Sequence, residues 1–320
     1  MVIFVKQTSV CQEGVRMKYF DLKLGFSCNN DCIHCVVADK RDTEDLNTEE
    51  VRKIIDSIPK DHVIGFTGGE ATIRKDFVEL LAYAKQTGHL TSLQTNGAQF
   101  EDEGFAKEAA KYLNGVLIAI HSHIEEIHDS IVRVPGMYRK TIAGFANVLR
   151  LEIPCTTQTV ITKLNLETLP ETYDFIQTKK SKIRMNLTFP HPNGNALTNA
   201  ESIIPKFADA KEQIKQILTK YADLLNTEAI PLCYLYPYQD KVYNFDKRLL
   251  NEEYTPGLDA SNKDSNYFKD GFTEKYSLCL VKDKRKLSSC HKCQLESKCV
   301  GVWKEQLEIH PDDSLEPITF

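Results

Sequence analysis

The sequence predicts an α/β protein whose parallel sheet curls into a partial (β/α)6 barrel. Two observations favour this fold: strand-like and helix-like segments alternate over roughly the first 200 residues, and chemically active side chains gather where the strands end. Alternation of this kind is typical of a parallel sheet. Six strand–helix units fall short of the eight in a full TIM barrel, so we expect a partial barrel with its site at the C-terminal ends of the strands.

Strands and helices follow one another in a regular order from residue 18 onward. The predicted strands cover 18–25, 62–66, 90–94, 116–120, 156–162 and 182–188. The predicted helices cover 48–57, 75–87, 104–113, 138–149, 169–178 and 203–225. Asn47 and Asp76 stand where a helix N-cap or first turn is expected.

Composition limits the class of protein. The chain has 320 residues, of which 42% are hydrophobic and 27% are charged, so it can bury a large core. A net charge of -5 and the absence of a basic stripe argue against broad nucleic-acid binding and leave specific contact with RNA open. The longest clean apolar stretch, 116–120, is too short to span a membrane, and we expect a cytoplasmic protein. In a reducing compartment, ten cysteines suggest metal ligands.

Three of these cysteines stand close together after the first predicted strand. Cys28, Cys32 and Cys35 have the spacing C-x3-C-x2-C. Three thiolates can bind three irons of a [4Fe–4S] cluster, which leaves the fourth iron open for a substrate or cofactor. A zinc site is the alternative, but zinc sites usually have two pairs of ligands, and no second pair lies nearby in the sequence.

A glycine pair follows the second predicted strand. The segment Thr67-Gly68-Gly69-Glu70 comes about 35 residues after the cysteine triplet, within the length of one βαβ unit. Two glycines after a strand let the backbone approach a ligand closely. An ordinary turn is the alternative for this segment taken by itself.

The two motifs together resemble those of the radical S-adenosylmethionine (radical SAM) superfamily, whose fold is also a partial barrel. The resemblance implies a [4Fe–4S] cluster on the three cysteines, with S-adenosylmethionine (SAM) bound to the open iron. It implies that His34 lies near the adenine and that the segment from Thr67 to Glu70 meets the SAM amino group. The other SAM-binding positions that it implies are Asn96, His121, Ser122 and Asn165. The alternative for these four residues is a role in a turn or at a strand end. The alternative for His34 is a solvent-facing position on the loop.

A second cysteine group lies in the C-terminal third. Cys290, Cys293 and Cys299 resemble the core of SPASM and Twitch extensions, which implies an auxiliary [4Fe–4S] cluster. Trp303 stands where a full SPASM motif would have another cysteine, so we expect one auxiliary cluster. Its fourth ligand is Cys233 or Cys279, and a zinc ribbon that includes Cys279 is the alternative. If Cys233 is not a ligand, it is a candidate hydrogen-atom donor.

These features predict three regions. Residues 1–200 are expected to form the barrel, 201–229 a linking helix, and 230–320 a SPASM/Twitch-like auxiliary-cluster region.

The resemblance implies a radical SAM oxidoreductase or maturase that uses a 5′-deoxyadenosyl radical to remove hydrogen from its substrate. The expected substrate is a ribosomally made peptide, which would be crosslinked, epimerised or oxidised. A small molecule such as a sugar or alcohol, acted on by an epimerase or dehydrogenase, is the first alternative. A non-catalytic metal-binding module is the second, although such a module needs no SAM-binding motif.

The same resemblance implies partners. An electron donor such as a flavodoxin or ferredoxin would reduce the cluster. Only 27 residues precede Cys28, too few for a winged-helix peptide-recognition domain. We therefore expect peptide recognition by the C-terminal region or by a separate protein.

Overall fold

A computed structural model describes residues 18–244, 254–255, 284–311, 313 and 315–319. Its central sheet is parallel throughout, with strands in the order β8-β7-β6-β5-β4-β3-β2-β1-β9. The strands are β1 (Lys18–Lys23), β2 (His62–Thr67), β3 (Leu90–Thr95), β4 (Gly115–Ala119), β5 (Cys155–Val160), β6 (Arg184–Thr188), β7 (Leu225–Glu228), β8 (Tyr243–Asn244) and β9 (Tyr254–Thr255). The predicted parallel partial barrel is confirmed.

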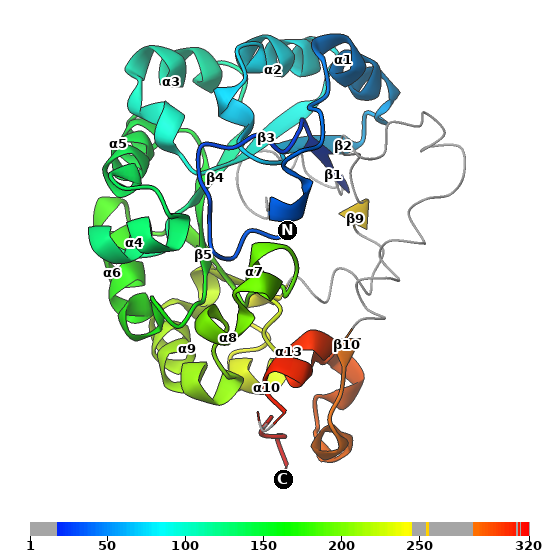
Figure 1. Ribbon diagram of the computed structural model, residues 1–320, viewed down its shortest axis with the longest axis vertical. Coiled ribbons are helices and arrows are strands. Elements are labelled where there is room, and N and C mark those ends of the chain that lie inside the picture. Colours follow the sequence, from blue (N-terminus) through cyan, green and yellow to red (C-terminus); the bar gives the residue numbers. More distant parts are fainter. Residues whose placement is uncertain (1–17, 245–253, 256–283, 312, 314, 320) are drawn as a thin grey trace.

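Helices follow the strands and cover the outside of the curled sheet, as the arc of α1 to α6 and α9 in Figure 1 shows. The helices are α1 (Thr48–Ser57), α2 (Phe77–Gln86), α3 (Glu103–Ala110), α4 (Glu125–Val132), α5 (Met137–Arg150), α6 (Leu169–Lys179), α7 (Asn195–Thr198), α8 (Ala200–Ile203), α9 (Phe207–Tyr221), α10 (Leu232–Leu235) and α13 (Lys304–Ile309). Because helices cover the outer face, strand residues are buried in long runs. In β2, every residue but the last is buried.

Local signals set the start of α1. The Asn47 side chain accepts a hydrogen bond from the Glu50 backbone at 3.0 Å, and the Glu50 side chain accepts one from the Asn47 backbone at 2.8 Å. This reciprocal capping box satisfies two backbone donors that a helix start otherwise leaves unpaired. Val51 and Ile55 then bury one face of the helix against the core. The N-cap predicted at Asn47 is therefore present.

The sheet extends beyond the six predicted strands. Helix α9 ends at Tyr221, and β7 then pairs with β6, so the segment expected as a linking helix over 201–229 also contributes a strand. Strands β7, β8 and β9 have four, two and two residues, too few to show an alternating pattern. Helix α4 was not predicted either. The domain boundaries stay a prediction.

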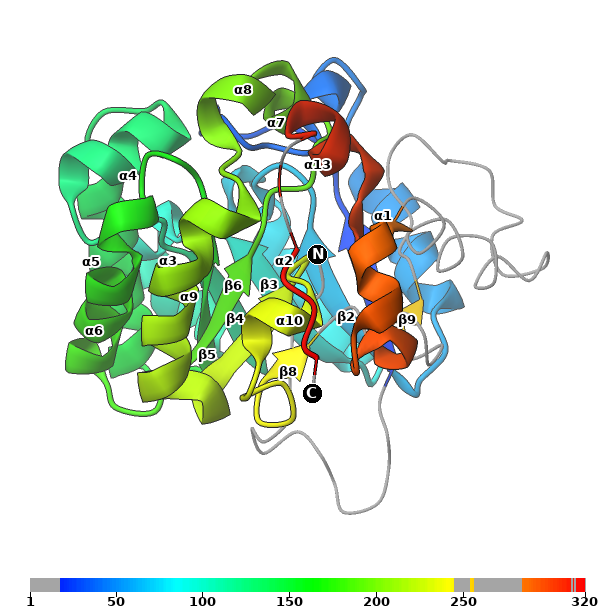
Figure 2. The same ribbon diagram turned by 90° about the horizontal axis from the view of Figure 1, so that it is seen from below.

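The C-terminal segment packs beside the loops at one end of the barrel. Figure 2 shows α13 next to α7 and α8 at this end. Gln306 Nε2 donates to the Pro205 carbonyl at 3.1 Å, and the Asp313 carboxylate accepts from the Phe207 amide at 2.8 Å. The entry to α9 is therefore fixed by residues about 100 positions further along the chain.

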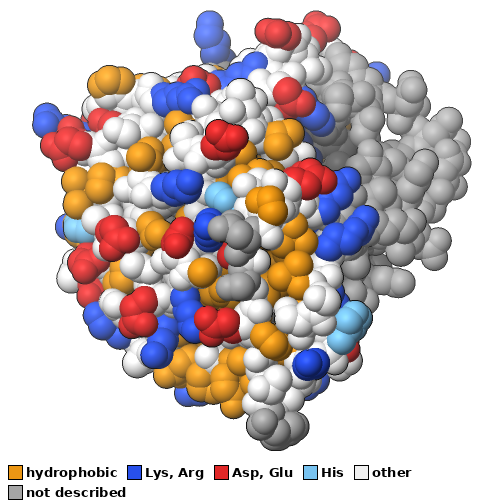
Figure 3. All heavy atoms as spheres, turned by 60° about the horizontal axis from the view of Figure 1, so that its bottom comes forward, with side chains coloured by type: hydrophobic (Ala, Val, Ile, Leu, Met, Phe, Trp, Pro, Cys, Tyr) orange, Lys and Arg blue, Asp and Glu red, His pale blue; other side chains and the backbone are white. Residues whose placement is uncertain are grey.

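The described residues contain no helix that is long and apolar enough to cross a membrane. Figure 3 shows one face of the molecule, on which acidic and basic side chains are interspersed with apolar ones. This face therefore carries no stripe of a single charge.

Candidate functional site

The cysteine triplet lies on the loop between β1 and α1, and the segment after β2 binds that loop directly. The Gly69 amide donates to the Gly25 carbonyl at 2.9 Å, and the Glu70 amide donates to the Ser27 carbonyl at 2.8 Å. A Cβ atom on Gly68 would lie 2.2 Å from the Gly25 carbonyl oxygen, and one on Gly69 would lie 2.2 Å from that of Ser27. The glycine pair thus makes room for the cysteine loop itself, whereas the sequence suggested room for a ligand.

Helix α7 binds the same loop from another direction. The Asn195 amide donates to the Cys35 carbonyl at 2.9 Å, and its side chain donates to the Cys32 carbonyl at 2.9 Å. The Asn199 side chain reaches the Ile33 carbonyl at 3.2 Å, and the Ile33 amide donates to Ile131 of α4 at 2.9 Å. Three separate segments therefore fix the backbone that carries the three thiols.

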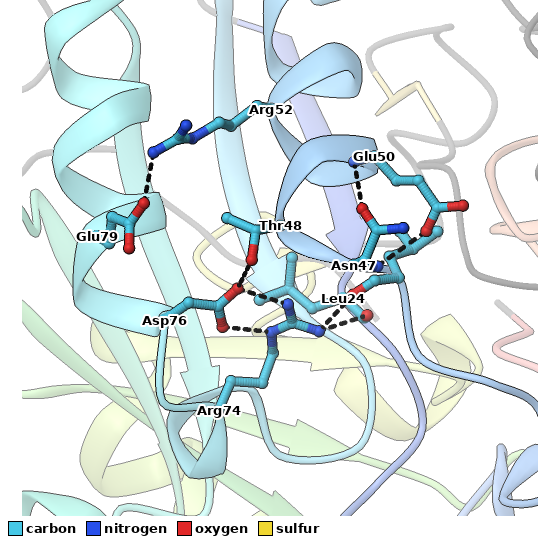
Figure 4. A network of polar contacts seen from close by, with 9 residues as sticks. Leu24, Asn47, Thr48, Glu50, Arg52, Arg74, Asp76 and Glu79 are labelled. Atoms are coloured by element: carbon cyan, nitrogen blue, oxygen red, sulfur yellow. Dashed lines mark hydrogen bonds and ion pairs between the residues drawn. The ribbon is translucent and has the colours of Figure 1, made fainter.

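An arginine braces the base of the loop, as Figure 4 shows. Arg74 donates to the Leu46 carbonyl at 2.6 Å and, with a longer bond of 3.4 Å, to that of Leu24. Its other guanidinium nitrogens form two bonds with the Asp76 carboxylate at 3.0 and 2.7 Å. Thr48, at the start of α1, donates to the same carboxylate at 2.7 Å. The two ends of the cysteine loop are thus tied to the segment after β2.

A cavity of about 220 Å³ opens at the C-terminal ends of the strands. The sequence-predicted residues that line it are Cys28, Cys32, His34, Cys35, Thr67, Gly68, Gly69, Glu70, Asn96 and His121. The fold therefore brings together the cysteine triplet, the glycine segment and the ends of β3 and β4.

Ser122 and Asn165 do not line this cavity. Ser122 is fully buried, and its hydroxyl accepts from the Ile124 amide at 3.1 Å. The Asn165 side chain is also fully buried: it accepts from the Thr162 amide at 2.7 Å and donates to the carbonyls of His121 at 2.7 Å and Val160 at 2.9 Å. Both side chains instead form hydrogen bonds with backbone groups at the ends of β4 and β5.

Glu70 is a buried carboxylate with four protein donors. Oε1 accepts from the Thr72 amide at 3.1 Å, the Thr72 hydroxyl at 2.6 Å and the Thr95 hydroxyl at 2.8 Å, and Oε2 accepts from the Asn96 amide at 2.7 Å. Burial raises the pKa of Glu70, and these donors oppose that shift. The side chain therefore joins the ends of β2 and β3, in addition to lining the cavity.

Two neutral histidines form another part of the wall. The rings of His34 and His121 meet edge to face with centroids 4.6 Å apart. Burial, followed by the nearby His128, lowers the pKa of His34 to about 4, and burial also lowers the pKa of His121 well below its usual value. His121 Nδ1 accepts from the Val160 amide at 3.4 Å, so the neutral ring carries its proton on Nε2.

The cavity also has lining residues to which the sequence analysis assigned no role. They include Arg41, Gln158, Thr188, His191 and Glu228. Thr188 and Glu228 end β6 and β7, and His191 follows β6. Thr188 could have been found from the sequence, because it is a polar residue at the end of a predicted strand. Glu228 could not, because the strand that it ends was not predicted.

Four cysteines surround a second, smaller cavity. Cys233 of α10 lines it together with Cys290, Cys293 and Cys299. Burial, and then the neighbouring thiols, raise the pKa of Cys233 to about 12. Cys279, the other candidate for the fourth ligand, lies outside the described residues.

Within the described part of the chain, no three His, Cys, Asp or Glu side chains are arranged to hold a single metal ion. A cubane cluster does not require such a group, because each thiolate binds a different iron.

Comparisons with known proteins identify the domain. Residues 22–176 match the family model described as the Radical SAM superfamily, so the chain contains a radical SAM domain. An Fe-coproporphyrin III synthase from Methanosarcina barkeri is 32% identical over 158 residues, which are 48% of this chain and 39% of that protein. The mycofactocin maturase MftC from Mycolicibacterium smegmatis is 31% identical over 153 residues, which are 47% of this chain and 39% of that protein.

A crystal structure of SuiB from Streptococcus suis, bound to S-adenosylmethionine, has the same fold with a TM-score of 0.63 and 18% identity. The match covers 92% of this chain and 74% of that chain. The chain spans about two fifths of the length of the two curated relatives.

The cofactors that belong to this domain, a [4Fe–4S] cluster and SAM, fit the residues present. Burial raises the pKa of Cys28 to about 11 and raises that of Cys32 further. Thiolates at these positions therefore need a compensating positive charge, which a cluster's iron supplies. The adjoining cavity, lined by Glu70, Asn96 and two neutral imidazoles, offers hydrogen-bonding groups for a polar cofactor.

Proposed function

We propose that this chain is a radical SAM enzyme that modifies a ribosomally made peptide. The observation that carries the proposal is the single cavity that joins the three thiols of Cys28, Cys32 and Cys35 to the segment from Thr67 to Glu70. Two named relatives support the peptide substrate: MftC is called a maturase, and SuiB has been crystallised with its precursor peptide SuiA.

The chain's own residues would hold and shield the cofactors. Cys28, Cys32 and Cys35 would ligate the cluster, and the wall of Asn96, His34 and His121 would face SAM. When bound, these cofactors supply a carbon-centred radical that removes a hydrogen atom from the substrate. Apolar side chains in the lining, among them Phe26, Leu117 and Val160, would limit the access of water to the bound cofactors.

The second cavity supports an auxiliary [4Fe–4S] cluster on Cys233, Cys290, Cys293 and Cys299. Four thiols around one cavity are a full ligand set for such a cluster. The position of Cys233 among the other three supports its role as the fourth ligand. It is absent from the lining of the larger cavity, which gives no support to the alternative role as a hydrogen-atom donor.

Release of 5′-deoxyadenosine tests the activity. The protein is reconstituted anaerobically with iron and sulfide and incubated with SAM and dithionite. The parent and the control Cys155→Ala should release 5′-deoxyadenosine, because Cys155 lines neither cavity, whereas Cys32→Ala should release none. No release by an iron-loaded parent would contradict the enzyme assignment.

A small-molecule substrate is the second candidate, because the relative at 32% identity is named for a porphyrin product. Addition of a precursor peptide encoded by a neighbouring gene should increase 5′-deoxyadenosine release and produce a mass change in the peptide. A response to an iron porphyrin or a sugar, with none to peptide, would favour the second candidate.

A further inference from the structure

A row of amide side chains crosses three neighbouring strands and ends at the large cavity. Gln158 of β5 lies opposite Asn186 of β6, and Asn186 lies opposite Asn226 of β7. Thr188 stands two residues after Asn186 and so points to the same face of the sheet. Gln158 and Thr188 both line the cavity. Side chains inside a barrel are usually bulky and apolar, so a polar row in this position requires a reason.

The side chains of this row bond one another in a single direction. Asn226 Nδ2 donates to Asn186 Oδ1 at 2.7 Å, and Asn186 Nδ2 donates to Gln158 Oε1 at 3.1 Å. Gln158 Nε2 then donates to the Thr188 hydroxyl oxygen at 2.6 Å. All four residues are buried. A buried network whose members bond one another holds its polar groups in one arrangement.

The row ends on two hydrogens that are left over at the cavity. The Thr188 hydroxyl accepts the bond from Gln158, and its own hydrogen goes to no acceptor among the residues that the structure describes. The Gln158 amide nitrogen carries two hydrogens and gives one of them to Thr188. Because a buried donor without an acceptor is destabilising, an oxygen atom in the cavity beside these two groups is favourable. Water fills that place in the free protein, and a ligand oxygen would replace it.

The surroundings favour an uncharged acceptor. Both donors are neutral, and Arg41 is the only lysine or arginine among the described residues that line the cavity. Arg41 belongs to the cysteine loop, where it hydrogen-bonds Cys35 and lies near Cys28. An anion at the wall of β5 and β6 would therefore lack a cation beside it, whereas a carbonyl oxygen needs only the two neutral donors.

We propose that Thr188 and Gln158 form a subsite that binds a backbone carbonyl oxygen of the peptide substrate. The inference rests on the proposed function and names two residues that position its substrate. The predicted SAM contacts that line the cavity come from the cysteine loop and from the ends of β2, β3 and β4, so this wall is open to the substrate. A carbonyl bound there fixes the substrate backbone relative to cofactors in the same cavity.

Binding of a peptide-like amide tests the subsite. Nα-acetyl-leucine methylamide is equilibrated by anaerobic dialysis with the reconstituted protein and SAM, beside the analogue in which sulfur replaces both carbonyl oxygens. Sulfur is the weaker hydrogen-bond acceptor. The parent should bind the oxygen probe about three- to tenfold more tightly than the sulfur probe, the difference expected for one neutral hydrogen bond.

Three variants separate the hydrogen bond from the shape of the wall. Thr188→Val removes the hydroxyl at nearly constant volume and should abolish the preference for oxygen, whereas Thr188→Ser keeps the hydroxyl and should keep the preference. Thr157→Val is the matched control on β5. The Thr157 hydroxyl is buried, lies outside the lining of the cavity and has no hydrogen-bond partner among the described residues, so this variant should behave as the parent. SAM affinity should be the same in all three, which a general loss of structure would not allow.

Failure of the parent to bind either probe, equal affinity for the two probes, or a preference for oxygen that survives in Thr188→Val would overturn the subsite. If Thr188→Val does not fold, the comparison of the two probes on the parent still decides. Any of these negative results, obtained together with peptide-stimulated release of 5′-deoxyadenosine, would remove the subsite and leave the proposed function standing. A preference for oxygen that depends on the Thr188 hydroxyl, in a protein that forms no 5′-deoxyadenosine under any condition, would support the carbonyl site and contradict the proposed function.

Discussion

Replacement of Glu70 by alanine removes the acceptor of four hydrogen bonds at the ends of β2 and β3. Two of the four donors are the backbone amides of Thr72 and Asn96, which cannot turn to another acceptor. The other two are the hydroxyls of Thr72 and Thr95, which can rotate. The cost of Glu70→Ala therefore falls mainly on the two amides, since both belong to buried residues.

The magnitude follows from those two amides. A buried donor left without a partner costs about 1–3 kcal/mol, so the free energy of unfolding should fall by about 2–6 kcal/mol. Glu70→Gln keeps one carbonyl oxygen that can accept from one of the amides, and its loss should be about half as large. If Glu70 also contacts the SAM ammonium, both variants should bind SAM about tenfold more weakly or worse, with the cluster retained.

Urea unfolding followed by circular dichroism measures the first effect, and titration of SAM into the reconstituted protein measures the second. Glu79→Ala is the control, because Glu79 is an exposed carboxylate paired with Arg52. A loss in Glu70→Ala below about 1 kcal/mol would refute the bracing role, since it would mean that both amides find other acceptors. Normal SAM affinity in a folded Glu70→Gln variant would refute the contact with SAM.

Three further predictions concern the cysteines. The parent should bind about eight irons as two four-iron clusters, and the triple variant Cys28→Ala/Cys32→Ala/Cys35→Ala about four; four in the parent, all lost with the triplet, would exclude the auxiliary cluster. Cys233→Ala should lose the auxiliary cluster's spectroscopic signal while Cys279→Ala retains it, and the reverse result would make Cys279 the ligand. In metal-free protein, Cys28 should react with iodoacetamide about a hundredfold more slowly than free cysteine at about pH 8, because its pKa of about 11 leaves little thiolate there. The rate should rise steadily toward about pH 11, and a rate equal to that of free cysteine at about pH 8 would contradict the raised pKa.

Much of the fold, and the cysteine triplet and glycine segment of the site, could be predicted from local sequence. The capping box at Asn47 and Glu50, the six longer strands and the spacing of Cys28, Cys32 and Cys35 are set by residues close together in the chain. The segment from Thr67 to Glu70 is likewise recognised from neighbouring residues alone. Short-range patterns of this kind reflect helix and strand periodicity and backbone freedom, which act over a few residues.

Tertiary structure decided the rest. Only in the folded chain do Gly68 and Gly69 pack against the cysteine loop, and only there is Asn165 seen to lie outside the lining of the cavity. It also brought Cys233 to three cysteines about 60 residues away in sequence. The row of amides that ends at Gln158 forms only because β5, β6 and β7 pair in register. Each of these arrangements depends on contacts between distant segments, which no local pattern encodes, because their energy arises only when the sheet has curled and brought the strand ends together.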